Sequence, residues 1–389
     1  MEKSGNLNGN FEYELLDEHQ QVIDLREKLA VLYASFFADI LWWELRDPSL
    51  IDKGYYKLLY YEQNVLKHII LFQYSVKTSK KIKVITQQFN ISSVHIENVC
   101  RILFNEFDKV RQIIFRNIFE PEHKQLHNTI FEKTIDDVII SLPKSIDTYI
   151  KSLGVNTRKD IRKNMNRVAR DFPGFEVQYF EKSDIVPEQM ENIASLNRIR
   201  MKMKGIESHQ TDNACKLQYQ YASTSGFGFT CICTINRKMV GGYIGFIIGE
   251  HAYVYIGGYD TSYNKYSMGQ VSMIHVFQYL IEEKNIKYCH MLDSTLGYKI
   301  HFGGIVHGLY VLRVFRNNGI YYFCYIIFKN IIVYYWKLKS NKIFNSFFIK
   351  LKRRMLDICC RVNCDKPRQR RGDNMYNLGC AKRNPCIKR

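Results

Sequence analysis

The chain of 389 residues has 56 Lys and Arg against 38 Asp and Glu, a net charge of +18, and 46% of its residues are hydrophobic. This length suits two ordinary domains, and the hydrophobic content excludes a mostly disordered chain. Seven prolines and 22 glycines exclude a collagen-like or low-complexity architecture. We find no internal repeat of roughly 20 to 50 residues, which argues against solenoids and propellers.

The first half of the chain predicts a small α/β unit. Residues 1–50 are expected to form a helical lead-in, because Leu25, Leu29, Leu32 and Phe36 recur at helical spacing. Strands are expected at 55–61, 65–75, 81–87, 110–116 and 134–142, with a hairpin turn at 62–64 and a helix from Ser92 or Ser93 to about Phe107. We place a boundary near Pro143, so that residues 51–143 form the N-terminal domain.

The second half, residues 144–317, predicts a second domain that begins with a basic helix at 157–170. We expect next a strand at 175–180, two helices at 187–204 and 213–223, and a three-strand meander at 229–235, 239–248 and 252–258. A helix at 268–283, a strand at 287–292, a short helix and a last strand at 305–315 follow.

The stretch AYVYIGGYDTSYNKYSMGQ contains the most informative pattern. A strand ends, a loop carries Gly257, Gly258 and Gly269, and a helix begins. The start of a helix presents free backbone N–H groups and a partial positive charge, which together favour phosphate binding. Such glycines can also serve backbone freedom alone, or mark a bulge where strands part.

The phrases IGGYDTSYNKYSMGQ and LDSTLGYKIHFGG resemble the GNAT acetyltransferase superfamily. They are most similar to its CelD-type branch, which is related to the FemAB peptidyltransferases. The resemblance runs from the basic helix to about Phe315. It implies an α/β (α+β) fold: a mixed, mostly antiparallel sheet flanked by helices, with a smaller, degenerate GNAT-like domain at the N-terminus.

The resemblance also implies acetyl-CoA, or another acyl-CoA, as co-substrate. The strands at 251–257 and 287–292 would splay apart to admit the pantetheine arm, next to Tyr255, Gly257 and Gly258. The pyrophosphate would lie on the helix start at Tyr266, Ser267, Met268, Gly269 and Gln270. The usual pattern there is Gln or Arg, two residues, Gly, one residue, then Gly or Ala; this chain matches it only in part.

Acyl transfer needs a group that takes a proton from the acceptor and donors that stabilise the carbonyl oxygen. In the families resembled, an acid at a strand end and a following Tyr-Lys pair line the acceptor side. Asp293 would therefore orient or deprotonate the acceptor, Lys299 would act electrostatically, and Tyr298 would lie beside them. Capping of a helix by Asp293 and a solvated Lys299 are the alternatives.

Arginines on the predicted helices are candidates for binding a carboxylate or phosphate of the acceptor. Arg158 and Arg162 share one face of the basic helix, and Arg200 lies near the end of the next helix. A solvated helix face is the alternative. The cysteines lack the paired spacing of zinc sites, so we expect no metal.

Residues 318–389 form a basic, aromatic-rich tail with 17 Lys and Arg against three Asp, a net charge of +14 that leaves only +4 for the rest of the chain. Its segment NKIFNSFFIKLKRRML predicts an amphipathic helix that lies either on an anionic membrane surface or on the domain itself. Residues beyond about 365 are expected to be disordered. Because aromatic and basic residues interleave, nucleic acid, including tRNA, is the rival partner.

The first residues lack the apolar core of a signal peptide, and Cys231 and Cys233 alternate in a strand-like run, typical of buried, reduced thiols. We therefore expect a cytoplasmic protein, peripheral at the inner face of the membrane if the tail binds lipid. The resemblance implies transfer of an acyl group to an amine or hydroxyl of a sugar or amino-acid-like acceptor, in polysaccharide or cell-envelope biosynthesis, by direct attack in a ternary complex. The alternatives are a FemAB-like aminoacyltransferase that uses aminoacyl-tRNA, and a non-catalytic, membrane-associated binding module.

Overall fold

The computed structural model describes residues 3–7, 11–17, 28–29, 31–74, 80–120, 128–293, 297–316, 322–323, 325–327 and 330. Contacts divide the chain into a compact unit, Met1–Tyr322, and a second unit, Phe323–Arg389. The predicted amphipathic helix and the residues beyond 365 lie outside the described residues. In the part that is described, no helix is both long and apolar enough to cross a bilayer.

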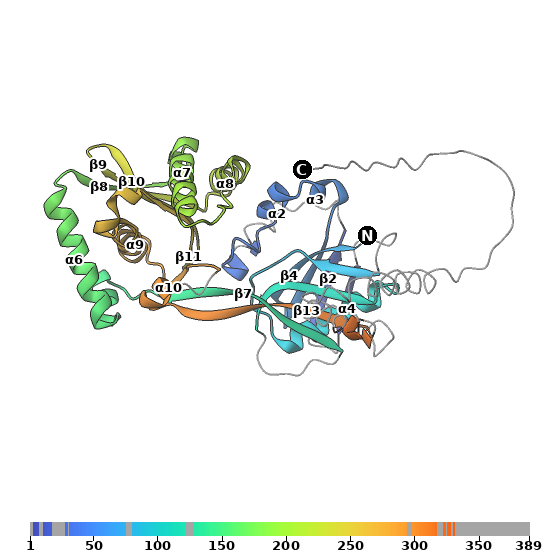
Figure 1. Ribbon diagram of the computed structural model, residues 1–389. Helices are drawn as coiled ribbons and strands as arrows, with labels where there is room; N and C mark the ends of the chain where they lie inside the picture. Colours follow the sequence, from blue (N-terminus) through green and yellow to red (C-terminus); the bar gives the residue numbers. More distant parts are fainter. Residues whose placement is uncertain are drawn as a thin grey trace, which may run out of the picture. The chain divides into compact units, whose positions relative to one another are not determined.

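The strands of the described residues form one mixed sheet in the order β1-β2-β3-β4-β5-β6-β13-β7-β12-β11-β10-β9-β8 (Figure 1). Only the pairs β5–β6 and β11–β12 are parallel, so the predicted, mostly antiparallel sheet is confirmed. The strands are β1 (Lys3–Leu7), β2 (Phe11–Leu16), β3 (Tyr56–Glu62), β4 (Val65–Tyr74), β5 (Lys81–Val84), β6 (Gln112–Phe119), β7 (Thr129–Ser141), β8 (Phe175–Glu181), β9 (Gly228–Ile235), β10 (Lys238–Ile248), β11 (His251–Tyr259), β12 (Tyr288–His290) and β13 (Ile305–Phe315).

The helices flank this sheet, as predicted. They are α2 (Ile40–Arg46), α3 (Ser49–Lys53), α4 (Ser93–Glu106), α5 (Ile146–Ser152), α6 (Val155–Asp171), α7 (Pro187–Met203), α8 (Asp212–Ser225), α9 (Met268–Gln278) and α10 (Gly297–His301), with short helical turns η1 (Lys182–Asp184), η2 (Thr261–Tyr266) and η3 (Tyr279–Glu283).

The helical lead-in predicted for residues 1–50 is wrong at its start, where β1 and β2 pair as an antiparallel hairpin. The apolar residues of β2, Phe11, Tyr13 and Leu15, alternate with polar ones, and alternation is the period of a strand that is buried on one side. Leu15 is buried in the core of the first half, against β3 and β4.

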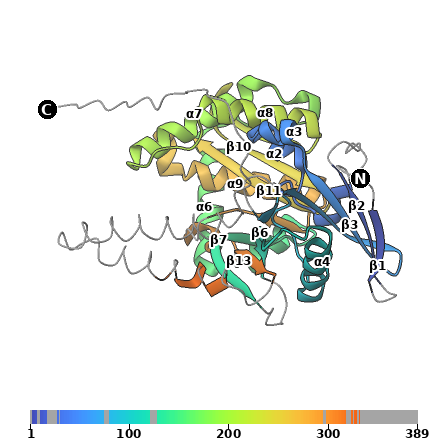
Figure 2. The same cartoon turned by 90° about the vertical axis from the view of Figure 1, so that its right-hand side faces the viewer.

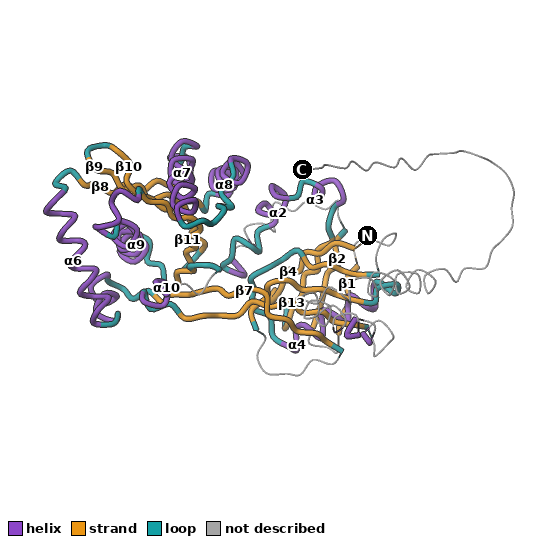
Figure 3. Tube along the Cα trace, in the orientation of Figure 1, coloured by secondary structure: helices purple, strands orange, loops and turns teal. Residues whose placement is uncertain are grey.

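The two halves of the sheet repeat one order of elements. In both, a strand is followed by two helices, three antiparallel strands, a helix, and a strand parallel to the one before that helix: β2 to β6 in the first half, β8 to β12 in the second. The long strands β7 and β13 join the halves at the centre (Figure 3). This repeat supports a companion GNAT-like unit, while the boundary near Pro143 stays a prediction because the sheet is continuous there.

Two apolar cores cover the two faces of the second half. On one face α6 and α9 pack against β11 residues such as Ala252 and Val254. On the other face α2, α7 and α8 pack against Tyr253 and Ile256 (Figure 2). Because α2 belongs to the first half of the chain, the two halves share this second core. Cys231 and Cys233 are buried in β9, as predicted.

Candidate active site

The strands β11 and β12 separate after three paired residues. His251, Ala252 and Tyr253 pair with Tyr288, Cys289 and His290, and β12 then ends, whereas β11 continues to Tyr259. The predicted separation of these strands is therefore confirmed. Residues 254–259, which have no strand partner on the β12 side, are called the open edge of β11.

A β-bulge lies on the open edge. Ile244 of β10 pairs with Ile256 and Gly245 pairs with Val254, so Tyr255 is the extra residue. A bulge bends its strand and increases its twist, which helps to turn β11 away from β12. It also places both Tyr255 and Ile256 against the core under α7 and α8.

The start of α9, which follows the open edge, is not capped by a side chain. Its N-cap residue, Ser267, has left-handed backbone angles (φ 51°, ψ 46°), and its hydroxyl accepts no capping hydrogen bond. By contrast, the equivalent helix α4 is capped by Ser92, whose hydroxyl accepts from the His95 N–H at 3.2 Å. The first N–H groups of a helix lack intrahelical acceptors, so α9 keeps the anion-binding capacity that α4 partly uses for its own cap.

Two predicted side chains at this helix start belong to the core instead. Tyr266 is 7% exposed and Met268 is fully buried, so only their backbone groups are placed to meet a ligand. Gln270 accepts a hydrogen bond from Asn164 of α6 at 2.8 Å. A Cβ on Gly269 would lie 2.7 Å from the ring of Tyr259, so protein packing already requires this glycine.

Packing also accounts for the glycine pair of β11. A Cβ on Gly257 would lie 2.2 Å from the Tyr243 ring, and one on Gly258 would lie 2.3 Å from the Ile193 carbonyl oxygen of α7. The pair therefore allows α7 to approach the open edge closely. This proximity brings α7 side chains to the Gly257 backbone.

The Gly257 carbonyl faces away from β10. Backbone groups of a strand alternate in direction, and Asp260 N–H donates to Val240 of β10, so the groups of residues 257 and 259 point to the open side. Asn197 Nδ2 donates to this carbonyl at 2.8 Å, and the Arg200 guanidinium donates at 3.3 Å. The predicted acceptor residue Arg200 therefore lies at the predicted donor strand, with its guanidinium 5.1 Å from the centre of the Tyr259 ring.

Lys299 is buried, with 4% of its surface exposed. Its ammonium donates to the carbonyls of Met291, Leu292 and Asp293 at 2.7, 3.0 and 2.6 Å. Burial lowers the pKa of Lys299 to about 8, and the negative charges of Asp137 and Asp293 oppose this effect. Lys299 therefore holds the end of β12, where Leu292 has a positive φ of 57°.

Asp293 and Tyr298 lie on the surface next to the buried ammonium of Lys299. Asp293 is exposed, and its carbonyl is one of those that bind Lys299. Tyr298 is 48% exposed, and burial of its hydroxyl raises its pKa while the positive charge of Arg200 lowers it. The structure thus brings Asp293, Tyr298, Lys299 and Arg200 to the region where β11 and β12 part.

Arg158 and Arg162 lie elsewhere on the second half. Both belong to α6, and Arg158 donates to the Lys151 carbonyl at 3.1 Å. Further along the same helix, Arg167 donates to the Lys265 carbonyl of the loop before α9 at 2.7 Å. The helix therefore packs beside the start of α9, on the face opposite α7.

Sequence reasoning missed Arg46, which reaches the open edge from the first half of the chain. Its guanidinium lies 4.0 Å from the centre of the Trp42 ring and donates to the Tyr255 hydroxyl at 2.7 Å. Within the described residues, neither Arg46 nor Arg200 has a carboxylate at ion-pair distance. No local motif marks Arg46, because its relation to β11 exists only after α2 packs on the second half.

A buried polar chain across three strands was also missed. His290 Nδ1 lies 2.6 Å from Asp137 Oδ2, and His290 Nε2 lies 2.9 Å from His251 Nδ1. The His290 ring stacks on Tyr253 at 4.2 Å, at the last paired position of β11 and β12. Asp137 is fully buried and His290 is 3% exposed, so this chain fixes the strands where they begin to part.

The buried histidines predict how stability depends on pH. Burial lowers the pKa of His251 to about 4 and that of His68 to about 3, from 6.5. The unfolded chain therefore binds more protons as the pH falls from about 6.5 towards 4, and the free energy of unfolding decreases over this window. We expect His251→Gln to reduce this decrease in denaturant titrations, whereas the exposed His209→Gln should not; equal pH dependence in both variants would contradict this account.

Comparisons with known proteins show what this chain is similar to. Residues 155–300 match the model of the acetyltransferase (GNAT) domain family, and the fold of the chain is GNAT-like and related to that of FemX. Among solved structures, FemX matches with a TM-score of 0.55 and 10% identity, covering 78% of this chain and 98% of FemX.

A conserved protein from Bacteroides thetaiotaomicron has a TM-score of 0.47 and 14% identity, covering 77% of this chain and 99% of its own. L-PGS from Bacillus licheniformis has a TM-score of 0.42 and 13% identity, covering 65% and 82%. No curated protein matches the sequence. The CelD-type branch stays a prediction. Among the described residues, no group of three His, Cys, Asp or Glu side chains is arranged to hold a metal ion.

Proposed function

We propose that the protein is an acyltransferase that moves an acetyl or related acyl group from acyl-CoA to an amine or hydroxyl of a small acceptor. The observation that carries the proposal is the separation of β11 from β12 next to the uncapped start of α9. Backbone groups of the open edge would hold the pantetheine arm, and the first N–H groups of α9 would hold the pyrophosphate. The GNAT match of residues 155–300 covers both features.

The acceptor would approach from the face covered by α2 and α7. Arg46 and Arg200 reach the open edge from this face, and Asp293 and Tyr298 lie at the end of β12 and just after it. Within the described residues neither guanidinium has a carboxylate at ion-pair distance, which favours an acceptor that bears a phosphate or carboxylate. A sugar phosphate or an amino-acid-like acceptor satisfies this condition. Arg158 and Arg162, on the α9 side, would instead face the phosphates of the donor.

The proposed reaction is a direct transfer. Asp293 takes a proton from the acceptor amine, and the amine nitrogen attacks the thioester carbonyl carbon. Backbone N–H groups of the open edge stabilise the oxygen as it becomes negative. The C–N bond forms, the C–S bond breaks, and the proton that the amine loses to Asp293 passes to the sulfur, which leaves as the thiol. Lys299 positions Asp293 through its carbonyl and does not touch the reacting atoms.

One observation favours the second candidate, an aminoacyltransferase that uses aminoacyl-tRNA. The Gly257 carbonyl, which a pantetheine amide would bond, already accepts from Asn197 and Arg200. A donor without a pantetheine arm would not compete for it. The basic helix α6 beside the start of α9 would suit a nucleic-acid backbone as well as CoA phosphates.

The biosynthetic setting, polysaccharide or cell-envelope synthesis, follows from the resemblance alone. The cytoplasmic location, with the basic tail at the inner membrane surface, is proposed from the residues of the N-terminus, the thiols and the tail. A binding module without catalysis is the third candidate, and it would leave Asp293 without a role.

A binding and turnover experiment separates these candidates. Acetyl-CoA is expected to raise the melting temperature and to release free thiol when amino-sugar phosphates or amino acids are added. Asp293→Asn is expected to lower thiol release about 100-fold or more, since a general base contributes this much, while the variant stays folded in a thermal melt. The exposed Asp184→Asn is the matched control. Stabilisation by charged tRNA but not by acetyl-CoA would overturn the first candidate in favour of the second.

A further inference from the structure

The Gly257 carbonyl on the open edge of β11 accepts two hydrogen bonds of unequal quality. The Asn197 amide donates at 2.8 Å, and the Arg200 guanidinium donates at 3.3 Å. A carbonyl oxygen has two lone pairs, so a further donor enters only if one of these two leaves. The longer bond is the weaker one, and Arg200 is therefore the group that a ligand displaces.

Asn197 is held in place from its other side. Ser208 Oγ donates to Asn197 Oδ1 at 2.9 Å, which fixes the amide with its NH₂ group towards Gly257. Ser208 in turn accepts from the Gln210 N–H at 3.1 Å. The amide thus has one defined orientation, and it keeps the Gly257 carbonyl in position when Arg200 departs.

The Arg200 guanidinium can bind other groups once a ligand displaces it from the Gly257 carbonyl. Its Nε is buried and has no hydrogen-bond partner within the described part of the chain. Its guanidinium lies above the ring of Tyr259 and close enough to Tyr298 to lower the pKa of that hydroxyl. The side chain therefore lies next to the open edge of β11. Among the described residues it has an unsatisfied donor and no carboxylate partner.

From this geometry we infer that Arg200 couples the two substrates of the proposed reaction, with Asn197 as the fixed positioning residue. An N–H of the donor arm takes the place of Arg200 on the Gly257 carbonyl, and the released guanidinium binds the anionic group of the acceptor. By linkage, each ligand then tightens the binding of the other by the same factor. The inference rests on the proposed function, because it needs the donor at the open edge.

The test uses the full chain and two probes. S-acetylpantetheine stands for the donor arm without its phosphates. N-acetylglycine, whose amine is already acylated and cannot react, stands for the anionic acceptor; pyrophosphate is avoided because the start of α9 is the proposed site of the donor pyrophosphate. Isothermal titration gives the dissociation constant of each probe with and without the other. In the wild type each is expected to tighten the other by about three- to tenfold, which corresponds to one hydrogen bond.

Arg200→Gln gives the sharpest expectation. The variant should bind S-acetylpantetheine more tightly than the wild type, because the competitor for the carbonyl is weakened, and it should show no coupling to N-acetylglycine. A merely structural arginine would not improve donor binding when replaced. Asn197→Asp, which cannot donate to the carbonyl but still accepts from Ser208, should weaken donor binding.

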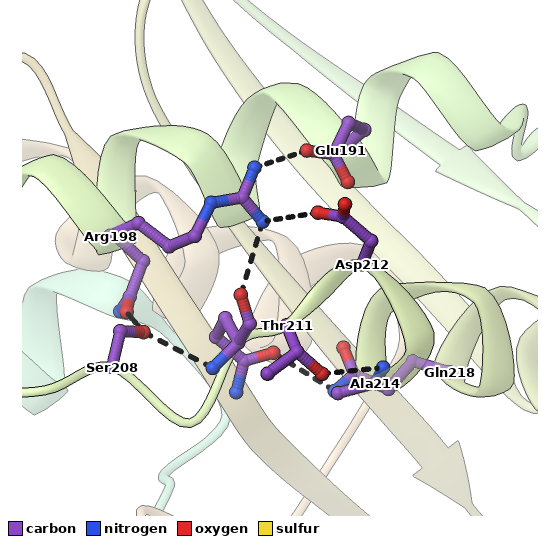
Figure 4. A network of polar contacts seen from close by, with 9 residues as sticks. Glu191, Arg198, Ser208, Thr211, Asp212, Ala214 and Gln218 are labelled. Atoms are coloured by element: carbon purple, nitrogen blue, oxygen red, sulfur yellow. Dashed lines mark hydrogen bonds and ion pairs between the residues drawn. The ribbon is translucent and has the colours of Figure 1, made fainter.

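Lys202→Gln is the matched control on the same helix, because Lys202 is exposed. Arg198 is unsuitable as a control: it pairs with Glu191 and donates to the Gln210 carbonyl at 3.1 Å, in the network beside Asp212 that Figure 4 shows and that also holds Ser208. Replacement of Lys202 should leave the coupling factor unchanged. If both probes bind the wild type without coupling, or if Arg200→Gln retains it, the inference is overturned while the proposed function stands. If S-acetylpantetheine does not bind, the acyl-CoA function itself fails.

Discussion

Replacing Asp137 by Asn is expected to lower the free energy of unfolding by about 1–3 kcal/mol, the range for leaving a buried hydrogen-bond partner unsatisfied. Asp137 is fully buried, and its Oδ2 lies 2.6 Å from His290 Nδ1. Its negative charge also faces Lys299, whose pKa it raises against the effect of burial. The isosteric amide keeps the shape and removes the charge, so the loss reports on electrostatics and hydrogen bonding alone.

Asp136→Asn is the neighbouring control for this change. Asp136 pairs with Lys133, which is half-exposed, three residues away on the same strand. Exposed or partly exposed pairs contribute about 0–1 kcal/mol, so this variant should unfold almost like the wild type. Denaturant titrations of the two variants measure the difference. Equal losses at both positions would show that the chain from Asp137 to His251 does not stabilise the strands.

Replacing Lys299 by Met is expected to have the largest effect on catalysis that does not involve a reacting group. The ammonium donates to three backbone carbonyls at the end of β12, and hydrogen bonds from charged groups contribute about 1.5–3 kcal/mol each. We expect the free energy of unfolding to fall by about 3–5 kcal/mol, with less than full additivity. Because Asp293 then shifts, turnover should fall about 100-fold.

The pH dependence of Lys299→Met provides a second readout. The pKa of Lys299 is about 8 in the folded chain, lowered by burial from 10.5. Between these values the unfolded chain binds more protons, so the free energy of unfolding should gain a contribution as the pH rises from about 8 to 10.5. The variant should lack this contribution. The control Lys287→Met removes an exposed partner of Glu250 and should retain this contribution. Equal pH profiles for the two variants would show that Lys299 is not buried against the three carbonyls.

Much of the second half could be predicted from the sequence because its signals are local. The alternating strands β9 to β11, the helix after Pro187 and the strand–loop–helix pattern around Gly269 are all read within a few residues. The resemblance of the same stretch to the GNAT superfamily located the separation of β11 from β12. The hairpin of β1 and β2 was missed, because the helical spacing further along outweighed the short alternation of Phe11, Tyr13 and Leu15.

The roles of single side chains could be predicted less well from the sequence. A lysine next to a tyrosine predicts a solvated or catalytic ammonium, whereas Lys299 is buried on three carbonyls that lie just after β12, six to eight residues earlier in the chain. The glycines at 257 and 269 indicate ligand contact, whereas the rings of Tyr243 and Tyr259 already require them. Local sequence patterns predict that these positions need glycine. Only long-range packing shows which side chains leave no room for a Cβ there.

The sequence by itself determined the sheet-and-helix order of the second half and the strand–loop–helix pattern around Gly269, because hydrophobic periodicity and glycine placement act over short distances. Only the tertiary structure decided that Arg46 reaches the Tyr255 hydroxyl and Arg200 the Gly257 carbonyl of the same strand, and that Asp137, His290 and His251 form one chain. These groups lie up to about two hundred residues apart along the chain, and strand pairing and helix packing alone bring them within hydrogen-bond distance.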